Sequence, residues 1–345
     1  MSKLATSLFT EGTALSLTVV PVASADASSL ATFAAKSGAA TTEQELIFLA
    51  AESSRVPSDI RRIVEQFRNG VLGADVLVLR GLHLGPLPPT PAHWSDAACG
   101  TSDAQLVLLA SVLGDVFAWA TQQDGRLVHN VLPVAGNENA QLGSNSESEL
   151  TLHTEDAFNE FRADYVMLLC LRNPRGVPTR FGFARHVSLT DSERAMLAEE
   201  AYPILPDISH LPAENSAGAA NFTAVMELQN RPSPVAILSS APGGPVLRYD
   251  PYYGMPAITP KHDDALKALT AELQASGESF ALMPGDLCVI DNHRVVHGRA
   301  PFRALYDGND RWLKRVCVTK DINRSRAVRH SDNCLSVGCD GTCGR

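Results

Sequence analysis

Two histidines and one glutamate have the residue types and the spacing of a metal site. His153 and Glu155 stand two residues apart, so they project to the same side of the chain if this segment is a strand. A third ligand must come from elsewhere, and both His293 and His297 follow an apolar run at 287–290. Two imidazoles and one carboxylate form the facial triad of non-haem iron(II) oxygenases, which leaves positions open for an oxoacid and dioxygen. The residues therefore predict an iron(II) site on His153, Glu155 and one of the two later histidines.

Two arginines downstream carry the charges that such a site would need. Arg311 lies 14 residues after His297, and Arg315 lies four residues further, so both point to one side of a predicted strand. A guanidinium suits two-point contact with a carboxylate, and its burial without one is costly. We expect one arginine to bind the far carboxylate of 2-oxoglutarate and the other to bind an amino-acid carboxylate. A pair of surface arginines on an exposed face is the alternative.

The elements that must position these residues fall into two parts. Apolar residues at helical spacing predict helices over 43–70, divided at Pro57, over about 103–120 and over about 261–276. Strand patterns occur at 76–82, 127–134, 150–153, 165–172, 235–238, 246–249, 280–282, 287–290 and 312–318. Clustered strands with helices before and between them indicate a β-sandwich core flanked by helices. We expect one domain over 1–330, with a helical part at about 26–120, because no repeat or long linker divides the chain.

Composition excludes several classes of partner. The chain has 345 residues and a net charge of −9, which argues against a nucleic-acid partner because phosphate neutralisation needs a basic face. No run of 18 apolar residues occurs, so we expect no membrane span. Residues 14–25 faintly resemble a secretion signal, but Glu11 and Pro21 interrupt the pattern, and we expect a strand followed by a helix instead.

The seven cysteines show no disulfide or zinc pattern. Cys170 and Cys288 lie in apolar runs and are expected in the core, whereas Cys99 and Cys317 have no partner at a telling spacing. The remaining three lie in a Gly-rich segment at 331–345, which we expect to be a flexible tail with free thiols. An odd count and scattered placement are typical of a reducing cytoplasm, so we expect a cytoplasmic protein.

Four segments together resemble one known family. They are the His-Thr-Glu segment at 153–155, the strand at 165–172, residues 285–299 and residues 306–315. This combination is similar to the clavaminate-synthase-like iron(II)/2-oxoglutarate-dependent oxygenases, and the similarity extends over about 76–326. Within that group the chain resembles hydroxylases of free L-asparagine and L-arginine, which supply β-hydroxy amino acids for peptide antibiotics. The resemblance implies an α+β fold with a double-stranded β-helix (jelly-roll) core.

The resemblance also implies which residues bind iron and the co-substrate. It selects His297 over His293 as the third ligand, so that iron(II) is expected on His153, Glu155 and His297. It assigns the distal carboxylate of 2-oxoglutarate to Arg311. The family pattern places a threonine that assists oxoglutarate binding about 24–28 residues after Glu155. Thr179 is the nearest candidate, although the strict alignment falls close to Phe181.

For the substrate, the resemblance implies a clamp at both ends of an amino acid. Arg315 is expected to hold the α-carboxylate, Gln122 the head group, and Ser144 a further head-group contact with a register uncertain by one or two residues. Asp250 falls where the family places an acidic contact to the side chain or amino group. Arginine hydroxylases have a second aspartate two residues later, where this chain has Tyr252. Solvated loop residues are the alternative for Gln122, Ser144 and Asp250.

The expected activity is hydroxylation of a free L-amino acid by Fe(II), 2-oxoglutarate and O2, most simply at C3. Arginine, asparagine, lysine or a cyclic guanidino analogue would suit the polar contacts, in a pathway for natural products. The alternatives are an oxidative cyclase or desaturase of an amino-acid-derived substrate, and a non-catalytic jelly roll that binds a small molecule. Glu155 argues against a halogenase, which needs a small residue at that position to seat chloride.

Overall fold

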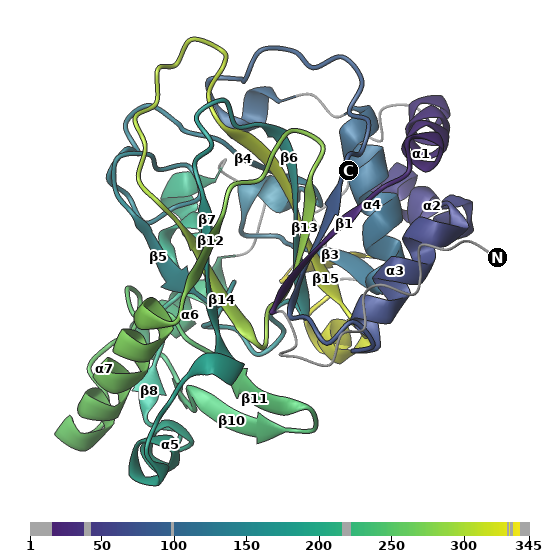
Figure 1. Cartoon of the computed structure of the whole chain (residues 1–345). Helices are drawn as coiled ribbons and strands as arrows, with labels where there is room; N and C mark the ends of the chain where they lie inside the picture. Colours follow the sequence, from purple (N-terminus) through teal and green to yellow (C-terminus); the bar gives the residue numbers. More distant parts are fainter. Residues whose placement is uncertain are drawn as a thin grey trace.

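A large mixed sheet forms the centre of the computed structural model, which describes residues 16–37, 43–97, 100–215, 222–329, 331 and 334–338 (Figure 1). Its strands run in the order β1-β2-β13-β6-β15-β3-β16, and β4 also pairs with β15. Only the β1–β2 and β3–β16 pairs are parallel. The strands are β1 (Leu17–Pro21), β2 (Val76–Arg80), β13 (Leu287–Asp291), β6 (Tyr165–Arg172), β15 (Trp312–Thr319), β3 (Asp115–Trp119), β16 (Ser336–Val337) and β4 (His129–Val131).

A second sheet of four antiparallel strands faces the first. Its order is β12-β7-β14-β5, with β12 (Glu278–Phe280), β7 (Thr179–Phe183), β14 (Val295–Arg299) and β5 (Leu150–His153). Two short antiparallel pairs lie beyond it: β8 (Tyr202–Pro203) with β9 (Pro234–Val235), and β10 (Leu238–Ala241) with β11 (Gly244–Leu247). The fold is therefore built from mixed sheets and helices.

The large sheet is buried on both faces, and the period of two along each strand separates two apolar clusters. Met167 and Leu169 of β6 belong to the cluster on the helical side. Val166 and Leu168 pack with Phe181 of the four-stranded sheet. Because side chains alternate across a strand, the near-continuous apolar run of β6 supplies both layers.

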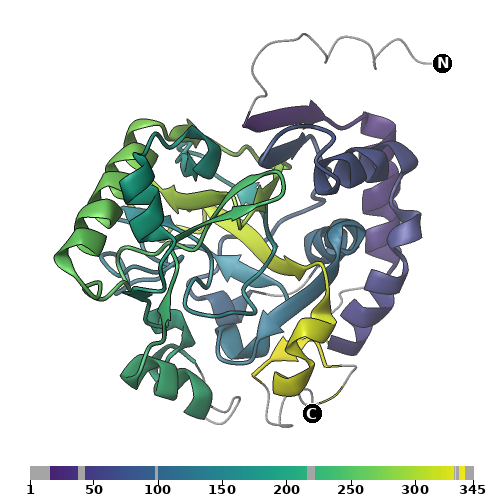
Figure 2. The same cartoon turned by 90° about the horizontal axis from the view of Figure 1, so that it is seen from below.

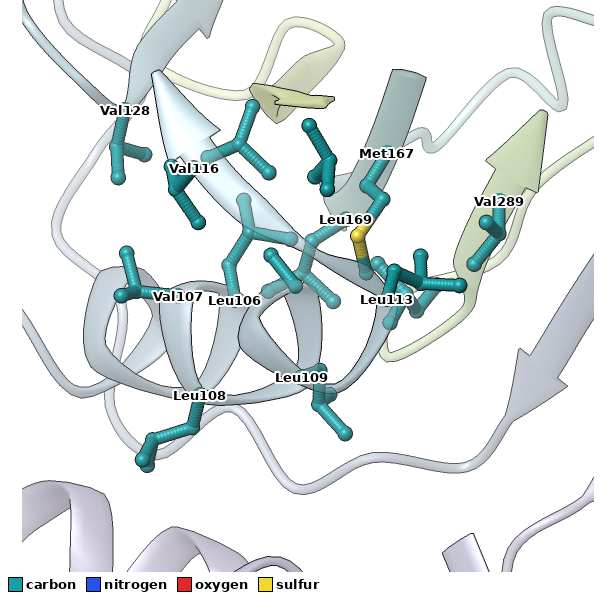
Figure 3. Packing of buried hydrophobic residues seen from close by; sticks show 14 of the residues in the cluster. Leu106, Val107, Leu108, Leu109, Leu113, Val116, Val128, Met167, Leu169 and Val289 are labelled. Carbon is teal, nitrogen blue, oxygen red and sulfur yellow. The ribbon is translucent and has the colours of Figure 1, made fainter. Parts of the chain in front are cut away.

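Helices cover the outer face of the large sheet (Figures 1 and 2). They are α1 (Ser24–Lys36), α2 (Glu43–Ala51), α3 (Ser58–Arg68) and α4 (Thr101–Leu113). Helix α4 is apolar on nearly all sides because it lies between the sheet and the other three helices. Figure 3 shows Leu106 and Leu113 of α4 beside Met167 and Leu169 of β6, whereas Leu108 points to the opposite side.

Helices also cover the four-stranded sheet. They include α5 (Asp191–Leu197), α6 (Thr223–Asn230) and α7 (Pro260–Ala275). Leu269 and Leu273 of α7 pack in one cluster with Val296 of β14. Among the described residues, no helix has both the length and the apolar character needed to cross a bilayer.

The structure differs from the pattern-based expectations in two segments. The helix expected over about 103–120 ends at Leu113, and the apolar residues after Gly114 form β3. A Cβ atom on Gly114 would lie 2.3 Å from the carbonyl oxygen of Thr319, so the strand begins where β15 passes close by. The tail expected to be flexible places Ser336 and Val337 in β16, and Cys334 is buried beside it. Cys99, Cys339 and Cys343 lie outside the described residues.

Candidate functional site

The two metal-binding segments meet on neighbouring strands. His153 ends β5 and pairs directly with His297 of β14, and the two imidazole centroids lie 4.8 Å apart. One carboxylate oxygen of Glu155 lies 3.3 Å from Nε2 of His297 and 3.9 Å from Nε2 of His153. The three ligand atoms thus converge on one point, as a facial triad requires.

Contacts behind these side chains fix their orientation. Nδ1 of His153 donates to the carbonyl of Thr151 at 2.8 Å, which leaves Nε2 free to act as a ligand. Thr154 faces away from the site, as alternation predicts, and pairs with the backbone of Tyr249. Asn292 bonds both backbone groups of Glu155, accepting from its N–H at 2.9 Å and donating to its carbonyl at 3.1 Å.

His293 lies elsewhere. Its Nε2 is 2.8 Å from a carboxylate oxygen of Asp164, and it is absent from the cluster of His153, Glu155 and His297. The structure therefore brings His297, and not His293, beside the other two candidate ligands.

Charges on Glu155 and Arg315 are balanced within the site. Burial opposes ionisation of Glu155, but Arg315 and the two histidines outweigh it and hold its pKa well below its usual value. Arg315 contacts Glu155 directly, and it also donates to Oε1 of Gln122 at 2.6 Å and to Nδ1 of His129 at 2.6 Å. Burial and Arg315 lower the pKa of His129 well below its usual value, so this imidazole stays neutral and accepts the bond.

One cavity is lined by the three candidate metal ligands and Arg315, and also by Arg311 and Thr179. Nη2 of Arg311 lies 3.4 Å from Oγ1 of Thr179, which is a long hydrogen bond. Burial lowers the pKa of Arg311 to about 10, and its Nε has no hydrogen-bond partner among the described residues. Phe181, two residues after Thr179, is buried in the apolar cluster between the sheets. Of the two positions considered for the assisting threonine, only Thr179 lies beside Arg311.

The head-group candidates also line this cavity. Gln122 is buried between Arg315 and Ser209, whose hydroxyl accepts from its Nε2 at 2.7 Å. Ser144 lines the cavity, and its hydroxyl accepts a bond from Asn137 at 3.1 Å.

The wall around Asp250 is acidic. Burial, opposed by His153 and reinforced by Asp207, raises the pKa of Asp250 to about 6. Asp207 lines the same cavity from a second segment, and Glu214 from a third position close to it. Tyr252 lies at the mouth, with 56% of its surface exposed.

Several residues of this cavity were not predicted from the sequence. They are Asp156, Asp207, Ser209, Glu214 and Arg299, together with the supporting residues His129 and Asn292. Arg299 could have been found, since it stands two residues after His297 and alternation puts it on the same face. Asp207 had no such signal, because its loop is placed against residues distant in sequence, such as Tyr253.

Comparison with known proteins agrees with this geometry. The family model described as "Taurine catabolism dioxygenase TauD, TfdA family" matches residues 210–317. The enduracididine beta-hydroxylase of Streptomyces hygroscopicus is 38% identical over 292 residues, which cover 80% of this chain and 86% of that protein. The L-ornithine/L-arginine 3-hydroxylase of Catenulispora acidiphila is 38% identical over 291 residues, covering 79% and 84%.

Solved structures are similar over almost the whole chain. The non-haem iron oxygenase OrfP in complex with Fe, succinate and (3S)-hydroxy-L-Arg superposes with a TM-score of 0.87 at 36% identity, covering 93% of this chain and 100% of that one. OrfP in complex with Fe and alpha-ketoglutaric acid has a TM-score of 0.81 at 36% identity, with the same coverage. An asparagine oxygenase in complex with Fe(II), 2S,3S-3-hydroxyasparagine and succinate has a TM-score of 0.82 at 31% identity, covering 93% and 99%.

Proposed function

Since this chain belongs to the TauD/TfdA family of iron(II)/2-oxoglutarate-dependent oxygenases and is an amino-acid hydroxylase, we propose that it hydroxylates C3 of a free cationic L-amino acid. The substrate class is arginine, ornithine or a related guanidino amino acid. The observation that carries this choice is the set of three carboxylates, Asp207, Glu214 and Asp250, that line the same cavity as the arginines. The related hydroxylases named for enduracididine and for L-ornithine/L-arginine support it.

His153, Glu155 and His297 would hold the iron. Their donor set fits the ion, because two imidazole nitrogens and one carboxylate oxygen face a common point, with Glu155 and His297 buried and His153 partly buried. Iron and oxoglutarate, when bound, would activate dioxygen, which is the oxidant for cleaving a C–H bond. The protein's own contribution is to orient the ligands and to place the target carbon nearby.

Arg311 and Thr179 would bind the distal carboxylate of oxoglutarate. A buried guanidinium with an unpaired Nε has the geometry to donate two parallel bonds to a carboxylate, and Thr179 adds a hydroxyl donor at the same place. This pairing would offset the burial that lowers the pKa of Arg311.

Arg315 would bind the α-carboxylate of the substrate, with Gln122 and the Ser144 segment around the head group. Iron bound to Glu155 would take up the negative charge that Arg315 now contacts, which leaves the guanidinium available to a second carboxylate. Gln122 and His129 hold that guanidinium in place from the other side. A zwitterion fixed at this end would present C3 toward the metal ligands.

Asp207 and Asp250 would bind the cationic side chain. Their segments lie side by side, since the N–H of Leu205 bonds the carbonyl of Tyr253 at 2.9 Å and the N–H of Ile208 bonds its hydroxyl. The second aspartate that the sequence lacks at Tyr252 is thus replaced by a carboxylate from a different loop. A bound guanidinium or ammonium would relieve the repulsion that helps to raise the pKa of Asp250.

We also propose that the two facing sheets are the halves of a double-stranded β-helix. The strands β13, β6 and β15 pack across one apolar cluster against β7 and β14, and the metal ligands lie at the edge of that cluster.

A panel of free L-amino acids tests the proposed activity. Protein, Fe(II), 2-oxoglutarate and ascorbate are incubated with arginine, ornithine, lysine, asparagine or leucine, and succinate and product mass are followed. We expect arginine or ornithine to give succinate and a product with one added oxygen, placed at C3 by NMR. A preference for asparagine or leucine would overturn the substrate class. A product that has lost two hydrogens would instead support a desaturase or cyclase.

The acidic wall is tested by Asp207→Asn and Asp250→Asn. Each keeps the shape and removes one charge, so we expect KM for the cationic substrate to rise about 10–100-fold, as for a lost bond to a charged group. Binding of 2-oxoglutarate should stay unchanged, because neither carboxylate lies at the Arg311 end of the cavity. An unchanged KM in both variants would contradict the role of this wall.

A further inference from the structure

Strand β14 carries a second inward-facing group beside the metal ligand. Arg299 stands two residues after His297, so both side chains project from the same face of the strand. It lines the same cavity and is only 3% exposed. Gly298 between them faces the neighbouring strand, where a Cβ atom would lie 2.4 Å from the carbonyl oxygen of Leu150.

The pairing of β14 with β7 brings Arg299 close to the end of the cavity assigned to oxoglutarate. Arg299 pairs directly with Thr179, and directly opposed residues of antiparallel strands share a face (β7 and β14 lie side by side in Figure 1). Thr179 is also the hydrogen-bond partner of Arg311. Thr179 therefore pairs with Arg299 across the sheet and is hydrogen-bonded to Arg311.

No carboxylate within the described ranges balances these two charges. Arg299 forms no ion pair there, and its bonds go to neutral acceptors only: Oδ1 of Asn145, the carbonyl of Ser146 at 3.3 Å and the carbonyl of Ser148 at 3.2 Å. Its Nε is buried and unpartnered, as is that of Arg311. Two such cations in one cavity are costly without an anion.

We propose that Arg299 is a second cationic residue of the co-substrate site, which selects a 2-oxoacid that carries a further carboxylate over a monocarboxylate 2-oxoacid. This inference rests on the proposed function. Arg311 provides the planar two-point contact, and Arg299 adds a positive charge and an unpartnered Nε–H within the same cavity. Its contacts with residues 145–148 hold that charge in position. The competing role for Arg299 is a purely structural tether of the 145–148 segment.

Two substitutions separate the effect of the charge of Arg299 from the effect of its contacts with residues 145–148. Arg299→Lys keeps the charge but loses the planar fork that bonds three acceptors, whereas Arg299→Gln loses the charge but keeps amide donors. Calorimetry with the manganese-loaded protein, without amino acid, gives the Kd of 2-oxoglutarate and of 2-oxobutyrate. We expect Arg299→Gln to weaken 2-oxoglutarate at least about 10-fold and Arg299→Lys to weaken it less than about 3-fold. Binding of 2-oxobutyrate should change little in both variants.

Asn145→Ala serves as the matched control because it removes one tether contact and leaves the cation in place. It should leave the Kd of 2-oxoglutarate within about 2-fold of the wild type. Equal weakening by Arg299→Lys and Arg299→Gln, or equal loss of both oxoacids, would show a tether and overturn the proposal. If the wild type binds no 2-oxoglutarate, the proposed function itself fails. If it binds normally and Arg299→Gln does too, only the role of Arg299 fails.

Discussion

At the scale of single residues, Asn292 connects the two halves of the metal site. Its buried amide bonds the N–H and carbonyl of Glu155 and the carbonyl of Ala163 at 2.9 Å. It stands in the turn between β13 and β14, so it links the Glu155 segment to the hairpin that carries His297. Groups that hold a ligand in this way tune metal affinity without touching the metal.

Replacement of Asn292 should therefore weaken metal binding. Asn292→Ala leaves three buried backbone groups unpaired, and we expect metal affinity to fall about 10–100-fold, measured by calorimetric titration with Mn²⁺. Asn292→Asp keeps the acceptor for the N–H of Glu155 and loses both donors, so its loss should be smaller if that bond orients the ligand. Wild-type affinity in Asn292→Ala would contradict this role.

The sequence predicts the reactive residues well and their supports poorly. Types and spacing alone indicated His153 and Glu155, and the family resemblance, which the relatives confirm, selected His297 over His293. Asn292 and His129 were missed because a buried amide or a neutral imidazole has no periodic signature, and its role depends on partners distant in sequence. The structure brings His153, Glu155 and His297 together, but their role as ligands stays a prediction. The roles proposed for the other site residues also stay predictions; they are Arg311, Thr179, Arg315, Gln122, Ser144 and Asp250.

At the scale of elements, the close approach of β5 and β14 decides the geometry of the site. Gly298 permits this approach, because a side chain there would meet the backbone of both Leu150 and Thr151. The pairing of His153 with His297 depends on the same contact.

A methyl group at Gly298 should disturb both stability and metal binding. We expect Gly298→Ala to lower the free energy of unfolding by about 1–3 kcal/mol and to weaken Mn²⁺ binding at least about 10-fold, because the strands must separate. Denaturant unfolding and calorimetry measure the two effects. Gly100→Ala is the control, since its Cβ atom would meet nothing within 4 Å. If Gly298→Ala and Gly100→Ala lose stability and Mn²⁺ affinity equally, the close approach of β5 and β14 does not depend on Gly298.

Element prediction succeeded where local pattern and tertiary context agree. The strands at 150–153 and 165–172 have the bounds that the sequence indicated. The helix expected to reach residue 120 was wrong because Val116 and Phe117 fit a helical period, yet they pair with β15 as part of β3. Strand β7 was missed although a turn at 173–176 precedes it, because its five residues include only two large apolar side chains, Phe181 and Phe183. Whether such a segment forms a helix or a strand depends on pairing partners that the local sequence does not identify.

At the scale of the whole molecule, Asp164 joins three segments that lie far apart in the sequence. It precedes β6, accepts bonds from Thr319 and the N–H of Lys320 after β15, and contacts His293 before β14. Burial opposes its charge, but these hydrogen bonds outweigh burial and lower its pKa to about 2.

This depressed pKa predicts a contribution to stability that depends on pH. The contribution is fully present above the ordinary aspartate pKa of about 4 and is lost as pH falls toward 2, where the folded state also takes up the proton. We expect Asp164→Asn to be about 1–2 kcal/mol less stable than the wild type at pH 6, after allowance for partial exposure. Chemical denaturation at pH 6, 4 and 3 should show the difference shrinking, and a constant difference would contradict this explanation.

The proposed hydroxylation depends on the iron site, and the number of iron ions bound per chain tests this site most directly. Anaerobic titration with Fe(II) is made on the wild type, on His297→Ala and on His293→Gln, with folding checked by circular dichroism. We predict one ion per chain for the wild type and for His293→Gln, and loss of binding in His297→Ala, because only His297 faces His153 and Glu155. Retention of iron by His297→Ala together with its loss in His293→Gln would contradict the site described above.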